Sequence, residues 1–149
     1  MQIPTELDWL NPYDNADIEW AKENFFGKTI EEAEELFVKN ALHYQEAIMF
    51  MPSIPFRYYV HAYMNYLLGN RSESDTAAAS CFLTLIESKM EYDQDDLHAV
   101  WTRVKETIEH IRKNPKWFDW YPEWLDGGDL GYGDVNLEEK TIRLLSWDK

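Results

Sequence analysis

Polar and titratable side chains that could form a reactive or ligand-binding site gather between residues 44 and 63. They are Tyr44, Glu46, Arg57, Tyr59, His61 and Tyr63. An imidazole titrates at about pH 6.5, so His61 among phenols could act as a general acid or base. The same histidine could equally pack in the core and hydrogen-bond a backbone carbonyl, which is the commoner role. The segment therefore predicts a pocket lined by tyrosine, histidine and arginine as one of two candidate sites.

Other chemically capable residues do not match the patterns that their chemistry requires. Helical di-metal sites use Glu-x-x-His pairs, which the sequence lacks, and Glu106 and His110 are predicted to be a surface pair one turn apart. Cys81 falls on the apolar stripe of a predicted helix, where a cysteine acts as a small hydrophobic residue. The loop that begins at Asp126 lacks oxygen ligands at the third and fifth positions of a calcium-binding loop.

The common nucleotide-binding, serine-hydrolase and zinc-protease motifs are also absent from the sequence. We therefore expect no metal and no cofactor. Catalysis is less favoured than binding, because no set of residues matches a known catalytic arrangement.

The second candidate site is an acidic and partly aromatic surface. Glu31, Glu34 and Glu35 lie on the polar face of a predicted helix, and Trp120 and Trp124 belong to an aromatic run at residues 117–124. Aromatic side chains are enriched at protein interfaces. The alternatives are that the aromatic run is a satellite core holding the C-terminal segment, and that the acidic side chains only maintain solubility.

Net charge is the strongest signal in the composition. The 149 residues include 14 basic and 28 acidic side chains, a net charge of −14, and more than half of this excess falls within residues 1–53. Such a charge repels phosphate backbones and anionic lipids, so binding to nucleic acids or membranes is disfavoured. A basic protein partner would be attracted.

The sequence indicates a soluble, cytoplasmic protein. No run approaches the roughly 20 apolar residues that span a bilayer, and the first residues lack the basic and apolar regions of a signal peptide. The single cysteine excludes an internal disulfide, which suits a reducing compartment.

Apolar residues recur at helical spacing along most of the chain. They predict a short helix from residue 15 to Gly27 and a second that begins at a capping box of Thr29 and Glu32. This second helix either ends at Asn40 or continues towards residue 51. Further helices are expected at residues 56–68, with Ser53 as a candidate cap before it, at 75–91 and at 97–113. A last helix is expected at residues 136–145, with a strand at 141–147 as the alternative.

These elements predict an all-α fold in a single domain of residues 1–149. The expected architecture is a compact bundle of five or six helices with an aromatic-rich C-terminal lobe.

Five short segments also resemble a family of small bacterial proteins of unknown function. The segments read FFGKTIEEAEELF at 25–37, YQE at 44–46, MFMP at 49–52, FRYYV at 56–60 and SCF at 80–82. The resemblance covers residues 25–91 and implies a bacterial, cytoplasmic protein. It implies no activity and no site residues.

Two functions from different classes follow from these patterns. The first is a noncatalytic acidic module that binds a basic protein, for example an immunity-type protein that neutralises a basic toxin. The second is a small helical enzyme or ligand-binding protein that uses the Tyr/His/Arg-lined pocket. The binding module is preferred, because the negative net charge would attract a basic partner and no set of residues matches a known catalytic site.

Overall fold

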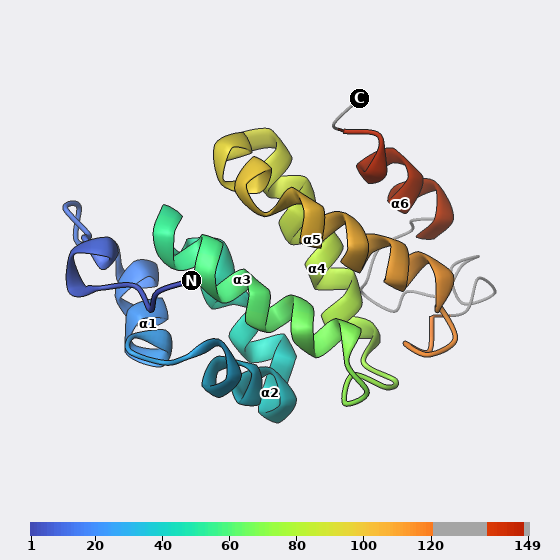
Figure 1. Ribbon diagram of the computed structural model, residues 1–149, viewed down its shortest axis with the longest axis horizontal. Coiled ribbons are helices and arrows are strands. Elements are labelled where there is room, and N and C mark those ends of the chain that lie inside the picture. Colours follow the sequence, from blue (N-terminus) through green and yellow to red (C-terminus); the bar gives the residue numbers. More distant parts are fainter. Residues whose placement is uncertain (121–136, 148–149) are drawn as a thin grey trace. The chain divides into compact units, whose positions relative to one another are not determined.

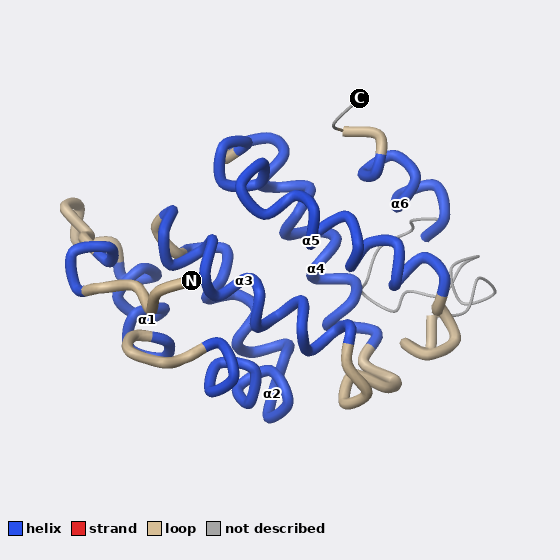
Figure 2. Tube along the Cα trace, in the orientation of Figure 1, coloured by secondary structure: helices blue, strands red, loops and turns tan. Residues whose placement is uncertain are grey.

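The computed structural model describes residues 1–120 and 137–147, and this part of the chain consists of helices joined by loops and turns (Figure 1). A 3₁₀ turn, η1 (Glu6–Trp9), precedes the helices α1 (Ala16–Phe25), α2 (Ile30–Phe50), α3 (Ser53–Leu68), α4 (Thr76–Tyr92), α5 (Gln94–Lys113) and α6 (Leu137–Leu145). No strand occurs within these ranges (Figure 2). The all-α prediction is therefore confirmed.

The alternative of a strand at residues 141–147 is wrong. Leu137, Thr141 and Leu144 are buried, and their spacing of four and three residues places them on one face of a helix. A strand would bury every second residue instead. The Thr141 hydroxyl also donates to the carbonyl of Leu137 one turn earlier, at 2.9 Å, which ties the side chain to the helix backbone.

Internal contacts divide the chain into two compact units, Met1–Tyr66 and Leu67–Lys149. The single-domain expectation stays a prediction. The first unit contains η1, α1, α2 and most of α3. The second contains α4, α5 and α6.

Local capping signals set the boundaries of the first two helices. The Asn15 side chain accepts hydrogen bonds from the backbone amides of Asp17 and Ile18, and so begins α1. Gly27 follows that helix with φ of +79°, a conformation that a residue with a Cβ rarely adopts. Thr29 then forms the predicted capping box, since its hydroxyl accepts from the Glu32 amide and the Glu32 carboxylate accepts from the Thr29 amide.

The second helix continues past Asn40 to Phe50, but with a kink. Asn40 has φ −164° and ψ 83°, which is not helical. Its side-chain oxygen accepts a hydrogen bond from the amide of His43 at 3.1 Å, three residues later. Asn40 therefore acts as an internal N-cap that starts a new helical segment within α2.

An aromatic core joins α1, α2 and α3 within the first unit. The ring of Phe37 on α2 stacks on Tyr63 of α3, with centroids 4.9 Å apart and planes 15° apart. Phe25 of α1 meets Tyr59 of α3 edge-on at 5.3 Å. All four side chains are fully buried. Aromatic pairs of this kind add to the stabilisation from burial of their apolar area.

The apolar stripe predicted on α5 is confirmed in the second unit. Its buried members include Leu97, Val100, Trp101, Val104, Ile108 and Ile111. The helix begins at Gln94, three residues before the predicted start. Asp95 and Asp96 occupy its first turn, where negative side chains interact favourably with the helix dipole. Helix α4 packs against α5, and α6 contacts both.

The described part of the aromatic run folds back on the start of α4. The Trp117 carbonyl accepts from the Ser74 amide at 2.7 Å, and the Trp117 indole N–H donates to the Ser72 hydroxyl at 3.3 Å. The hydroxyl of Thr76 donates to the Phe118 carbonyl. Phe118 is fully buried, so the residues of this run up to 120 pack as part of the second unit.

Candidate functional site

Two residues of the predicted pocket lie in the aromatic core of the first unit. Tyr59 and Tyr63 are fully buried. The Tyr59 hydroxyl donates a hydrogen bond to the carbonyl of Lys28 at 2.7 Å. Burial raises the pKa of Tyr59 well above its ordinary value, so the phenol stays protonated at neutral pH. Tyr59 therefore links α3 to the loop between α1 and α2, which is a structural role.

The remaining residues of that pocket are distributed over other parts of the unit. Arg57 and His61 are one turn apart and half-buried, and helical spacing places both about 160° around α3 from Tyr59. Tyr44 is half-buried, with its ring edge-on to Phe25 at 6.5 Å. Glu46 is exposed. A single pocket containing all six residues stays a prediction.

The predicted partner surface is exposed in some places and buried in others. Glu31 and Glu35 are exposed on α2, and Glu34 is half-buried. Trp120 is 5% exposed, so it presents little area to a partner. Trp124 and the loop beginning at Asp126 lie outside the described residues.

Among the residues that the structure describes, more exposed carboxylates without ion pairs lie in the first unit than in the second. Each unit has a net charge of −7, from 4 basic and 11 acidic residues in the first and 10 and 17 in the second. Within the described residues of the first unit, Asp14, Asp17, Glu23, Glu31 and Glu46 are exposed and form no ion pair. Their charge is therefore directed to the solvent.

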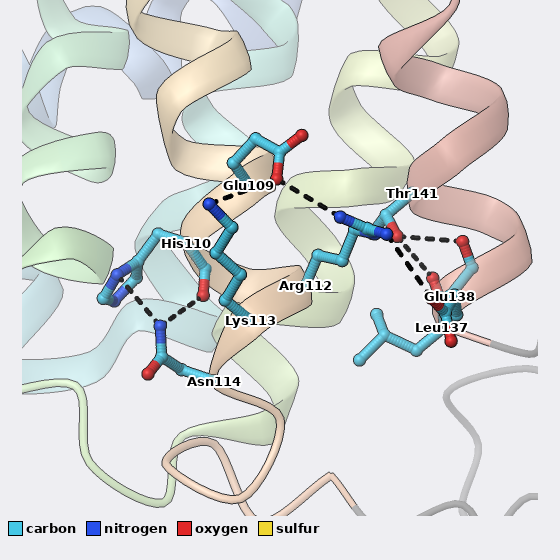
Figure 3. A network of polar contacts seen from close by, with 8 residues as sticks. All are labelled: Glu109, His110, Arg112, Lys113, Asn114, Leu137, Glu138 and Thr141. Atoms are coloured by element: carbon cyan, nitrogen blue, oxygen red, sulfur yellow. Dashed lines mark hydrogen bonds and ion pairs between the residues drawn. The ribbon is translucent and has the colours of Figure 1, made fainter.

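The described residues of the second unit form ion pairs within and between its helices. Figure 3 shows Arg112 of α5 extended towards Glu138 of α6, at 3.4 Å, while it also pairs with Glu109 on its own helix at 3.5 Å. Arg143 of α6 pairs with Glu87 of α4 at 2.5 Å. These ion pairs link the three helices.

Glu106 and His110 do not form the predicted surface pair. Glu106 pairs with Arg103 at 2.7 Å instead. His110 is half-buried, with its ring edge-on to Phe118 at 5.9 Å. Burial lowers the pKa of His110, and the weaker effects of the Leu67 carbonyl and Glu106 oppose this shift. Burial therefore favours the neutral form of this imidazole.

Three exposed apolar side chains near the start of the chain were not identified from the sequence. Leu7 is 73% exposed, Leu10 66% and Tyr13 91%. A local signal was present, because Thr5 and Asp8 form a capping box that orders this turn. Leu7 and Leu10 are three residues apart, which places them on one side of a 3₁₀ turn.

No helix among the described residues is long and apolar enough to cross a membrane. The similarity over residues 25–91 stays a hypothesis. No protein-family model matches the chain, and no curated protein and no solved structure is significantly similar to it.

Proposed function

We propose that the protein is a noncatalytic binding module that holds a basic protein partner against the acidic surface of residues 1–66. An immunity-type protein that neutralises a basic toxin is a concrete form of this function. One observation carries the proposal: among the described residues, the first unit has more exposed carboxylates without ion pairs, such as Glu23, Glu31 and Glu46, than the second unit, where Glu73, Glu91 and Asp95 are of this kind.

The physical basis is electrostatic complementarity. A surface of one sign accelerates association with an oppositely charged partner and fixes its orientation, while it repels nucleic acids. Both effects weaken as salt screens the charges. A cytoplasmic location and a bacterial source, the latter from the similarity over residues 25–91, are part of the same proposal.

The test reverses charge at matched positions in the two units. Glu23→Lys lies in the last turn of α1 and Glu31→Lys is at the second residue of α2. The control, Glu91→Lys with Asp95→Lys, occupies the last turn of α4 and the second residue of α5. All four residues are exposed and form no ion pair with other described residues. Both double variants therefore change the net charge and the helix-dipole interactions equally.

Tagged wild-type protein and both variants would be incubated with native lysate at about 0.1 M and about 1 M salt, and captured proteins identified by mass spectrometry. We expect one stoichiometric basic protein at low salt, captured by wild type and by the Glu91/Asp95 variant. It should be lost at high salt and with the Glu23/Glu31 variant. Equal loss with both variants, or no captured protein at either salt, would contradict the proposal.

The alternative, a small enzyme or ligand-binding protein, has less support. The Tyr59 hydroxyl is already bonded to the Lys28 carbonyl, and Arg57 and His61 turn away from the Tyr59 face of α3. Because His61 is half-buried and not sealed, a ligand site on its own side of α3 is the remaining form of that alternative.

A further inference from the structure

The first residues of the chain form an ordered segment that is fastened to the first unit. We call residues 5–15 the N-terminal strap. Trp9 is 1% exposed, and its ring lies 6.1 Å from that of Tyr59. The Lys22 ammonium donates to the Glu6 carboxylate at 2.7 Å, which raises the pKa of Lys22. The Asn11 side chain bonds both the amide and the carbonyl of Asn15, at 2.9 and 2.7 Å.

Three of the exposed side chains of this strap are large and apolar. Leu7, Leu10 and Tyr13, which we call the apolar triad, are each at least 66% exposed. Single exposed hydrophobic residues are common on protein surfaces, but this strap exposes three large apolar side chains within seven residues of sequence. Because the backbone of the strap is already ordered, a partner would bind the triad with a small loss of conformational entropy.

Charge decides which kind of molecule can cover the triad. Asp14 and Asp17 adjoin it in sequence, are exposed, and form no ion pair with other described residues. A second copy of the chain, with its own net charge of −14, and an anionic membrane would both be repelled. A segment with apolar and basic side chains would be attracted.

We infer that the apolar triad is the docking anchor for a cationic amphipathic segment of the partner protein. The segment's apolar side chains cover Leu7, Leu10 and Tyr13, and its lysines or arginines face Asp14 and Asp17. An apolar centre with a charged rim is the usual composition of a protein interface. This inference rests on the proposed function, because it assumes a basic partner and specifies where that partner binds.

The probe is a fluorescein-labelled peptide of about 18 residues with leucine and lysine at helical spacing. A second peptide keeps the lysines and replaces every leucine with serine. The variant is Leu7→Ser with Leu10→Ser and Tyr13→Ser. Its control is Ile54→Ser with Ile142→Ser and Tyr92→Ser, which removes three other exposed apolar side chains. Fluorescence anisotropy gives the dissociation constants.

We expect the triad variant to bind the leucine–lysine peptide about tenfold or more weakly than wild type. Its weak, salt-dependent binding of the serine–lysine peptide should be unchanged, and the control variant should bind both peptides as wild type does. The single change Tyr13→Ser, at a 91% exposed position, should weaken binding in the same direction and serves if the triple variant does not fold.

Several results would overturn the inference. Wild type and the triad variant could bind the leucine–lysine peptide with equal affinity, or wild type could fail to bind it. Wild type could also form a dimer that the triad substitutions dissociate, which would make a second copy of the chain the occupant. Binding to phosphatidylserine vesicles that depends on the triad would make a membrane the occupant. None of them alters the capture experiment with Glu23→Lys and Glu31→Lys. The Glu23→Lys/Glu31→Lys variant could lose the captured partner while the triad variant binds the peptide as wild type does. That combination would support the proposed function and contradict only this docking site.

Discussion

Tyr59 carries a hydroxyl into an apolar setting, where its hydrogen bond to the Lys28 carbonyl replaces contact with water. The Tyr59→Phe variant keeps the ring contacts with Phe25 and Trp9 but leaves that carbonyl without its donor. We expect the free energy of unfolding to fall by about 1–2 kcal/mol in urea titrations. Tyr92→Phe, at a 73% exposed position, is the control and should leave stability unchanged. Equal effects of the two changes would show that the buried bond contributes nothing specific.

Protonation of the single residue His110 should make the free energy of unfolding depend on pH. Its pKa in the folded state is lowered by burial, whereas the unfolded chain takes up a proton at about the ordinary value of 6.5. Above that pH both states are neutral and the histidine has no effect. As the pH falls below it, the unfolded state binds more protons than the folded state, so stability is lost.

Urea unfolding at about pH 7.5 and pH 5.5 tests this dependence. The His110→Gln variant should lose less stability between the two values than wild type does. His98→Gln is a control on the same helix, at an exposed position. A pH dependence that is identical in wild type and His110→Gln would assign the effect to other groups.

At the scale of the element, the capping box decides where α2 begins. The Glu32 carboxylate accepts from the backbone and hydroxyl of Thr29, and these bonds lower its pKa. The change Thr29→Ala removes the hydroxyl that accepts from the Glu32 amide, and should lower the free energy of unfolding by about 1 kcal/mol. Thr29→Ser retains the oxygen and should remain close to wild type. If alanine and serine behave alike, the cap does not stabilise the helix.

At the scale of the whole molecule, the net charge of −14 opposes compact structure through self-repulsion. Salt shortens the Debye length from about 10 Å at 0.1 M to about 3 Å at 1 M. Screening also weakens the exposed ion pairs of the second unit, but such pairs contribute only about 0–1 kcal/mol each. Relief of repulsion should therefore dominate.

We expect the midpoint of urea unfolding to rise between about 0.1 M and about 1 M NaCl. The dependence of the free energy of unfolding on urea concentration should stay unchanged. The Glu23→Lys/Glu31→Lys variant is less negative by four charges, so its urea midpoint should rise less than that of wild type. A midpoint that stays constant or falls would mean that the paired charges outweigh the repulsion.

The helices and most of their boundaries were predictable because their signals are local. Thr29 and Glu32 form their capping box within one turn of backbone, and Gly27 ends the preceding turn through its own φ. The stripe from Leu97 to Ile111 repeats at helical spacing, so its burial followed from the sequence alone. Of the carboxylates predicted on the polar face of the second helix, Glu31 and Glu35 are exposed and Glu34 is half-buried, while their role in binding stays a prediction.

What covers each face was decided only by the tertiary structure. Periodicity shows which residues share a side of a helix, but not which distant residues pack against that side. Nothing near Trp120 in sequence distinguishes a buried tryptophan from a binding surface. Likewise, Tyr59 and His61 are close in sequence but on different sides of α3. The outward position of Leu7, Leu10 and Tyr13 depends on the burial of Trp9 against Tyr59, a contact across fifty residues that no local pattern encodes.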